Sequence, residues 1–186
     1  ENYSGALAAL LNVVEVDPSN RSAPEALFYA GRVAERSADL YLAATLWGRV
    51  ADEYSSSNLA PRAAFLSGIS LYRLGEFSNS ISRFSQAGSF SNNDIDETTA
   101  ALLWTGKAHS ENGDENLAVE AWETASITDP GGYYGLRARE LASGQLPFSP
   151  KPNIDFASSN SPAAQNEAEA WLAIQLGVPE HNLGTL

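Results

Sequence analysis

A small residue followed by apolar or aromatic residues four and seven positions later recurs four times along the chain. Spacings of three and four place the three side chains on one face of a helix, so each occurrence predicts an amphipathic helix. The occurrences begin 37, 37 and 38 residues apart, and such a fixed period is typical of stacked helical repeats. The four sets are Ala6/Leu10/Val13, Ala43/Trp47/Val50, Ser80/Phe84/Ala87 and Ala118/Trp122/Ala125.

Three glycines share this period and lie inside the helices predicted between these sets. Each is followed sixteen residues later by a large aromatic residue: Gly31 by Trp47, Gly68 by Phe84 and Gly106 by Trp122. Glycine inside a helix costs about 1 kcal/mol relative to alanine, so three at equivalent places need a packing reason. We predict that each aromatic side chain packs where the preceding helix has no side chain.

This pattern resembles the tetratricopeptide repeat (TPR) over residues 3–130. The matched positions are the small eighth residue, the small twentieth, the aromatic twenty-fourth and a terminal proline, Pro130. Gly75 and Gly113 match the turn glycine, whereas Glu35-Arg36-Ser37 replaces it in one repeat, and the unit is lengthened to 37–38 residues. The resemblance implies an all-α fold, a right-handed superhelix (α-solenoid) of TPR-like antiparallel helix pairs. No stretch alternates apolar and polar residues for long enough to predict a strand.

The periodic pattern stops at Pro130, and we divide the chain accordingly. Residues 1–144 are predicted to hold the repeats and a capping helix, and residues 145–161 a proline-rich crossing segment. Residues 162–186 are predicted to form further helices that continue into a region outside this sequence. There is no methionine, and the first half-repeat lacks its partner helix, so we expect a segment of a longer protein.

The part after Pro130 carries a second resemblance. The run Tyr-Tyr-Gly-Leu-Arg-Ala-Arg at 133–139, the proline-rich segment and Glu-Ala-Glu-Ala-Trp-Leu-Ala at 167–173 resemble the superhelical region of bacterial soluble lytic murein transglycosylases. The resemblance implies a non-catalytic scaffold in the cell envelope, periplasmic or extracytoplasmic, that helps to position peptidoglycan glycan strands for a catalytic domain.

The catalytic motifs of that family, Glu-Ser and Gly-Leu-Met-Gln, do not occur in this sequence. We therefore expect no catalytic residue in this chain, while a longer parent protein would be a lytic transglycosylase. The alternative is a general TPR adaptor that binds an extended peptide or a helix of a protein partner.

Composition narrows the possible chemistry. The formal net charge of −12 argues against binding to nucleic acid or anionic membranes, because both need basic patches. No apolar run approaches the ~20 residues that span a bilayer, so we expect no membrane insertion. There is no cysteine, and His109 and His181 are too far apart in sequence to indicate a zinc site. The run Asn92-x-Asp94-x-Asp96 begins like a calcium loop but lacks that loop's glycine and final glutamate, so it is better explained by helix capping. We expect neither a metal nor a cofactor.

The remaining candidate site is the concave face that the TPR resemblance implies. The first helix of each pair lines the groove in that family. Mapping this onto the chain predicts groove residues Arg32, Arg36, Phe65, Tyr72, Arg73 and Lys107, with Phe28, Glu35, Arg62, Ile69, Leu103 and Glu111 beside them. Arginine next to aromatic rings can stack on sugars and pair with carboxylates, which suits an acidic glycan strand or a peptide. The other interpretation is that these side chains only coat solvated helix faces.

Overall fold

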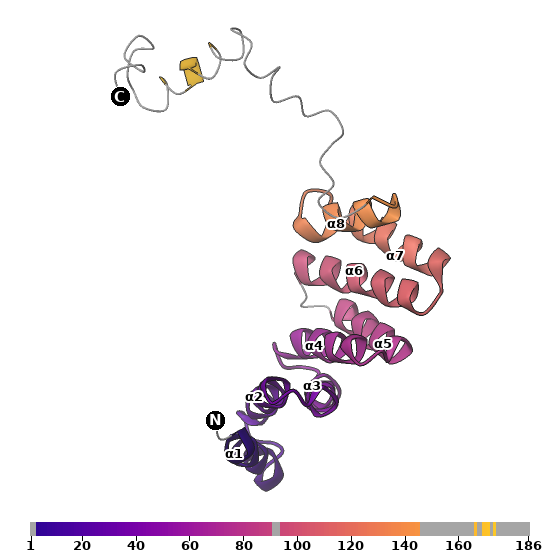
Figure 1. The fold of residues 1–186 in the computed structure, drawn as a ribbon. Helices are drawn as coiled ribbons and strands as arrows, with labels where there is room; N and C mark the ends of the chain where they lie inside the picture. Colours follow the sequence, from indigo (N-terminus) through magenta and orange to yellow (C-terminus); the bar gives the residue numbers. More distant parts are fainter. Residues whose placement is uncertain (1–2, 91–93, 146–165, 167–168, 172, 174–186) are drawn as a thin grey trace. The chain divides into compact units, whose positions relative to one another are not determined.

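The computed structural model of the chain describes residues 3–90, 94–145, 166, 169–171 and 173. All regular structure in this described part is helical, which confirms the all-α prediction (Figure 1). The helices with defined bounds are α1 (Tyr3–Val16), α2 (Ala23–Arg36), α3 (Leu40–Glu53), α4 (Ala60–Arg73), α5 (Phe77–Ser89), α6 (Ile95–Glu111), α7 (Glu115–Thr128) and α8 (Tyr133–Ala142).

The chain divides into two compact units, Glu1–Pro147 and Phe148–Leu186. The first unit contains all the repeats and α8. The predicted proline-rich segment 145–161 lies outside the described residues apart from Gln145, as does most of 162–186. The described residues of the second unit, at 166, 169–171 and 173, are helical.

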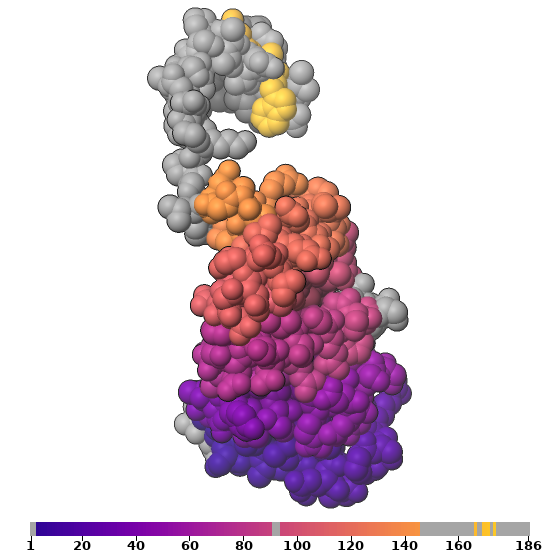
Figure 2. All heavy atoms as spheres, turned by 90° about the vertical axis from the view of Figure 1, so that its right-hand side faces the viewer, coloured from indigo at the N-terminus to yellow at the C-terminus, as the bar shows by residue number. Residues whose placement is uncertain are grey.

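Consecutive helices of the first unit pack against one another in chain order, and Figure 2 shows them following each other along the unit. The pairs α2/α3, α4/α5 and α6/α7 are antiparallel, since turns of only a few residues join their helices. Helix α8 packs against both α7 and α6. The predicted TPR-like stack of helix pairs is therefore confirmed.

Each helix pair is joined by a close contact between a glycine and an aromatic ring. A Cβ atom added to Gly31 would lie 2.6 Å from Trp47 Nε1, and one added to Gly106 would lie 2.4 Å from Trp122 Nε1. The same atom on Gly68 would lie 2.6 Å from Phe84 Cε1. These separations are too short for any side chain, so the predicted packing reason for the three glycines is confirmed.

The two tryptophans also make a directed hydrogen bond across their pairs. Trp47 Nε1 donates to the carbonyl oxygen of Phe28 at 3.0 Å, and Trp122 Nε1 donates to that of Leu103 at 3.1 Å. Both acceptors lie three residues before the glycine of the first helix. Phe84 occupies the middle pair and has no donor, so that joint relies on ring packing alone.

The first occurrence of the sequence pattern is less buried than predicted. In α3, α5 and α7 all three positions are buried, but in α1 Ala6 is exposed, and Leu10 and Val13 are only half-buried. The reason is that α3, α5 and α7 each pack between the preceding and the following helix, whereas α1 packs mainly on the helix that follows it, α2. Within the described residues, no helix precedes α1 to cover its other face.

The turns inside the pairs share one backbone geometry, including the turn that lacks glycine. Gly75 and Gly113 have φ angles of +78° and +85°, and Ala38, at the equivalent position of the first pair, has a φ angle of +65°. In each turn the next amide donates to the carbonyl five residues earlier, which is the hydrogen bond of a Schellman motif. Replacement of the turn glycine in the first repeat therefore does not change the turn. Ala38, rather than Glu35-Arg36-Ser37, takes the left-handed position.

A polar network joins the first two pairs on the side of the second helices. Arg83 of α5 donates from Nη1 and Nη2 to the carboxylate of Asp52 of α3, at 2.7 and 3.0 Å. Gln86 Nε2 donates to the same carboxylate at 2.9 Å. Gly48 provides the space, because a Cβ atom there would lie 2.7 Å from Arg83 Nη2. We call Asp52, Arg83 and Gln86 the outer network.

Gly68→Ala is expected to lower the free energy of unfolding by about 1–3 kcal/mol, because the new methyl group overlaps the buried Phe84 ring. Gly88→Ala is the matched control. A Cβ atom there would make an ordinary 3.8 Å contact with Ala101, so helix propensity should raise stability by up to about 1 kcal/mol. Urea unfolding followed by circular dichroism measures both, and equal effects would contradict the glycine–aromatic joint.

Ala38→Gly is expected to raise the free energy of unfolding by about 0.5–1 kcal/mol, because alanine is strained at positive φ and glycine is not. Gly75→Ala, where nothing lies within 4 Å of the added Cβ, should have the opposite effect for the same reason. Thermal melts should give a higher Tm for Ala38→Gly and a lower Tm for Gly75→Ala. A lower Tm for Ala38→Gly would show that the turn at Ala38 is unstrained.

Part of the loss of stability at acid pH should come from the outer network. The hydrogen bond from Arg83 is the main cause of a lowered pKa of Asp52. A carboxyl group whose pKa is lower in the folded than in the unfolded chain stabilises the fold at pH values above its unfolded-state pKa of about 3.9. This contribution disappears as the pH falls through the folded-state pKa. Asp52→Asn should therefore have a lower free energy of unfolding than the parent at pH 7. Below about pH 5 its free energy of unfolding should fall less steeply with pH than that of the parent. Glu123→Gln on α7 is the control and should keep the parent pH profile in urea unfolding.

Candidate functional site

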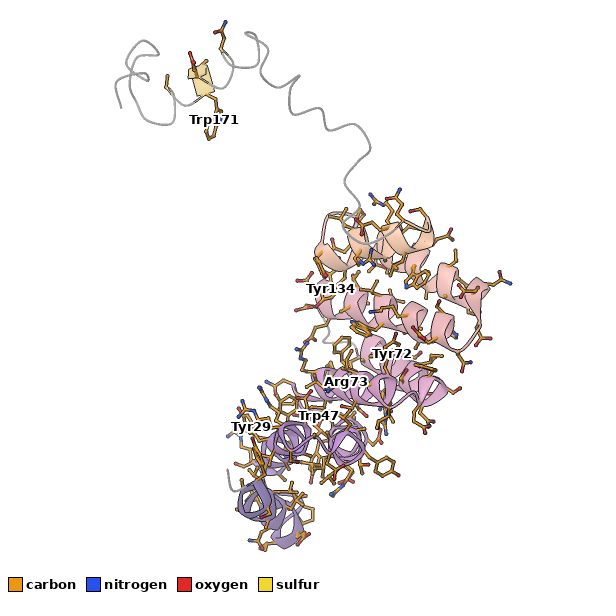
Figure 3. All side chains as sticks on the ribbon, in the orientation of Figure 1. Tyr29, Trp47, Tyr72, Arg73, Tyr134 and Trp171 are labelled. Atoms are coloured by element: carbon orange, nitrogen blue, oxygen red, sulfur yellow. The ribbon has the colours of Figure 1, made fainter. Side chains whose placement is uncertain are left out.

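The predicted groove residues lie on the first helices of the pairs, but they form several separate groups rather than one cluster. Arg32 and Arg36 of α2 and Arg73 of α4 are exposed, whereas Phe65, Tyr72 and Lys107 are half-buried. Figure 3 shows the labelled side chains Tyr72 and Arg73 on α4 and Tyr134 on α8. We call the surface of α2, α4, α6 and α8 that carries these residues the groove face.

Contacts across the groove face link neighbouring first helices. Arg73 Nη1 of α4 lies 3.3 Å from Glu35 Oε1 of α2. Tyr72 OH of α4 donates to Glu111 Oε1 of α6 at 3.4 Å. Burial, and then the negative charge of Glu111, raise the pKa of the Tyr72 hydroxyl, so it stays protonated and remains a donor.

An aromatic–cation cluster lies at the middle of the groove face. The Tyr72 and Trp104 rings meet edge to face with centroids 5.3 Å apart. Lys107 Nζ lies 3.9 Å from the centroid of Trp104 and 5.8 Å from that of Tyr72. Sequence reasoning placed Tyr72 and Lys107 on this face but missed Trp104, although its position three residues before Lys107 puts both on one side of α6.

A pocket of about 270 Å³ lies between α6 and α8 beside this cluster. Lys107 of α6 and Arg137 of α8 both line it, and the remaining lining is aromatic or aliphatic: Leu103, Trp104, Tyr133, Tyr134 and Leu141. Desolvation, and then the positive charge of Arg137, lower the pKa of the Lys107 amine, while Glu111 opposes the change. Two cations thus line the same pocket beside aromatic rings. We call this the α6/α8 pocket.

Sequence reasoning did not place the α8 residues in the groove. The run Tyr133–Arg139 was interpreted as a capping helix with a family resemblance, and in the structure α8 packs against α7 and α6. The sequence signal that could have identified them is the three-residue spacing of Tyr134 and Arg137, which puts both side chains on one side of the helix.

A second group of basic side chains lies on α2. Arg32 and Arg36, together with Tyr29 and Val33, line a hollow of about 320 Å³. Neither arginine forms an ion pair or a side-chain hydrogen bond with any described residue. Arg36 lies in the last turn of α2, where a cation interacts favourably with the helix dipole, but a second like charge four residues earlier disfavours the helix slightly. Helix stability therefore does not explain why both arginines are present.

Basic residues are unequally distributed between the two sets of helices. Seven of the eleven lysines and arginines lie on α2, α4, α6 and α8, whereas α1, α3, α5 and α7 carry only Arg49 and Arg83. Both of these are neutralised, Arg49 by Glu53 and Arg83 by Asp52. Each set of helices carries six acidic residues, so the formal net charge is +1 for α2, α4, α6 and α8 and −4 for α1, α3, α5 and α7.

A larger hollow, of about 470 Å³, lies on α3, α4 and α5 away from these residues. Its polar groups already have partners: Thr45 Oγ1 donates to the Tyr41 carbonyl, Ser67 Oγ to the Ala44 carbonyl and Ser82 Oγ to the Ser78 carbonyl. Arg83 and Gln86 belong to the outer network. Few polar groups remain there for a ligand, so the groove face is the stronger candidate site.

The described residues contain no group of three or more His, Asp or Glu side chains arranged to hold a metal ion. His109 Nδ1 is buried 3.7 Å from Asp114 Oδ2, and His181 lies outside the described residues. The Asp94 side chain accepts a hydrogen bond from the Glu97 amide at 2.7 Å, which confirms the helix-capping interpretation of this run. Among the helices described, none has the length and apolar character needed to cross a membrane.

Comparisons with known proteins agree with the repeat fold. The chain is similar to the crystal structure of MamA, with a TM-score of 0.57, 20% identity and coverage of 77% of this chain and 78% of that one. It is also similar to the TPR-like repeats of a Podosopora anserina kinesin light chain, with a TM-score of 0.59, 14% identity and coverage of 93% and 87%. No protein-family model and no curated protein matches the sequence. These comparisons support a TPR-like fold and provide no link to lytic transglycosylases.

Proposed function

We propose that this chain is a protein–protein interaction scaffold that binds an extended, acidic segment of a partner along its groove face. The observation that carries the proposal is the concentration of basic and aromatic side chains on α2, α4, α6 and α8 in an otherwise acidic chain. A TPR-like stack supports such a role, because its first helices present side chains from successive repeats to one ligand.

The geometry suggests how each part contributes. The exposed guanidinium groups of Arg32 and Arg36 can each make two parallel hydrogen bonds to a carboxylate. The Tyr72 and Trp104 rings provide apolar surface beside Lys107, so an acidic residue flanked by apolar residues is suited to this region. The net negative charge of α1, α3, α5 and α7 favours a ligand orientation that places its negative charge on the groove face.

Binding of labelled acidic peptides tests the proposal. An unstructured peptide of alternating glutamate and small residues should bind in fluorescence anisotropy at 50 mM salt and weaken at 300 mM, whereas its glutamine counterpart should not bind. Arg32→Gln/Arg36→Gln should raise the Kd at least about tenfold, since charge-assisted hydrogen bonds of about 1.5 kcal/mol or more are lost. The charge-matched control Arg21→Gln/Arg49→Gln should bind like the parent. Equal binding of acidic and neutral peptides would contradict the proposal.

A second candidate is the non-catalytic scaffold of a lytic transglycosylase in the cell envelope, with peptidoglycan as the ligand. The run Tyr133–Arg139 favours it, since this run carries the family resemblance and supplies aromatic and basic residues to the α6/α8 pocket. Purified peptidoglycan forms a further arm of the same experiment. Sedimentation of the chain with peptidoglycan, lost in an Arg32→Ala/Arg36→Ala/Arg73→Ala variant, would favour this candidate, and no co-sedimentation would count against it.

A further inference from the structure

We infer that the acidic partner segment is held by two separate cationic subsites, the α6/α8 pocket and the Arg32/Arg36 pair, and that their separation selects the spacing of acidic groups in the partner. The inference rests on the proposed function and extends it from a general preference for acidic chains to a defined spacing.

The α6/α8 pocket has the features of a subsite for one carboxylate. Lys107 forms no ion pair with any described residue, and Arg137 Nη1 is held by Glu140 Oε2 at 2.7 Å. With Arg137 paired in this way and Glu111 near Lys107 but not in contact with it, the Lys107 ammonium is the group in the pocket that is left to bind an anion, and its single charge matches one carboxylate better than a doubly charged phosphate. The Trp104 ring, 3.9 Å from Lys107 Nζ, replaces part of the water around the ammonium group and so strengthens its attraction for an anion.

The Arg32/Arg36 pair offers a different kind of subsite. Both guanidinium groups are exposed and lack partners among the described residues, and Tyr29 stands beside them, 47% exposed. Two free guanidinium groups one helical turn apart suit two neighbouring acidic side chains of an extended segment.

Between the two subsites the groove face offers less for an anion. Arg73 is already paired with Glu35, and Arg62 lies 5.5 Å from the Phe65 ring with the Glu97 carboxylate near enough to act on it. The middle therefore favours uncharged or apolar residues of the ligand.

The repeat geometry sets the separation of the subsites. Helix α2 is linked to α4 by the Glu35–Arg73 ion pair, and α4 packs on α6. With about 10 Å between neighbouring helix axes, the path from α2 across α4 to the pocket between α6 and α8 is about 20–30 Å. An extended chain advances about 3.3 Å per residue. The two groups of acidic residues in the partner should therefore be about six to nine residues apart.

Peptides that carry two Glu-Glu pairs separated by two, seven or fourteen Gly/Ser residues test this spacing by fluorescence anisotropy with the full chain. The seven-residue spacer should bind at least about tenfold more tightly than the two-residue spacer, because only the longer one reaches both subsites. The fourteen-residue spacer should bind somewhat more weakly than the seven-residue one, since the effective concentration falls as the linker lengthens.

Variants at each subsite provide the decisive comparison. Lys107→Gln or Arg32→Gln/Arg36→Gln should remove the spacer dependence and reduce all three peptides to similar weak binding. Lys107→Arg keeps the charge and should retain the dependence, and Arg49→Gln, on α3 and outside the groove face, should behave like the parent. Circular dichroism melts verify that each variant is folded.

The outcomes separate the two proposals. Acidic peptides that bind with equal affinity at spacers of two and seven residues, or a spacer dependence that survives Lys107→Gln, would overturn the two-subsite inference and leave the scaffold function standing. Failure of every acidic peptide to bind would overturn the scaffold function itself. Spacer dependence that disappears only in the subsite variants would support both.

Discussion

The fold depends on the close approach of a helical glycine to an aromatic ring in each pair. The missing side chain sets how near the second helix can come. In the first and third pairs the indole N–H then donates to a carbonyl one turn before the glycine, which also fixes how the second helix is rotated. In a stack where each unit contacts only its neighbours, such local geometry is passed from pair to pair. The arrangement of side chains on the groove face therefore depends on these three contacts.

Sequence reasoning predicted this part of the fold well because the contact is encoded at a constant interval. A helical glycine has no local advantage, so its recurrence sixteen residues before an aromatic residue indicated the packing partner directly. The turn at Ala38 was harder to predict, because alanine does not favour positive φ and the geometry is set by the hydrogen bonds of the surrounding turn. The low burial of Ala6 depends on which helices flank α1, which the pattern in α1 itself does not contain.

The candidate site was predicted only in part, for a physical reason. Tyr72 and Lys107 follow from the helix period, but their neighbours Tyr134 and Arg137 reach the site only because α8 packs back on α6. Helix α8 begins 38 residues after α6, in the place of a further first helix, but the glycine–aromatic pattern ends before it, so that pattern does not predict the contact. The structural comparisons likewise concern the backbone arrangement and leave the ligand to be inferred from the side chains of this chain.

The outer network distinguishes the first junction of the stack from the second. The first two pairs are linked on both sides, by Asp52 with Arg83 on one and by Glu35 with Arg73 on the other. The second and third pairs are linked through Tyr72 and Glu111 on the groove face, while among the described residues no ion pair joins α5 to α7. The Trp104 ring of α6 also meets the rings of Tyr72 on α4 and Phe84 on α5 across this second junction. The first junction is thus held partly by exposed ion pairs, which salt screens, whereas the second is held by aromatic packing, which salt does not weaken.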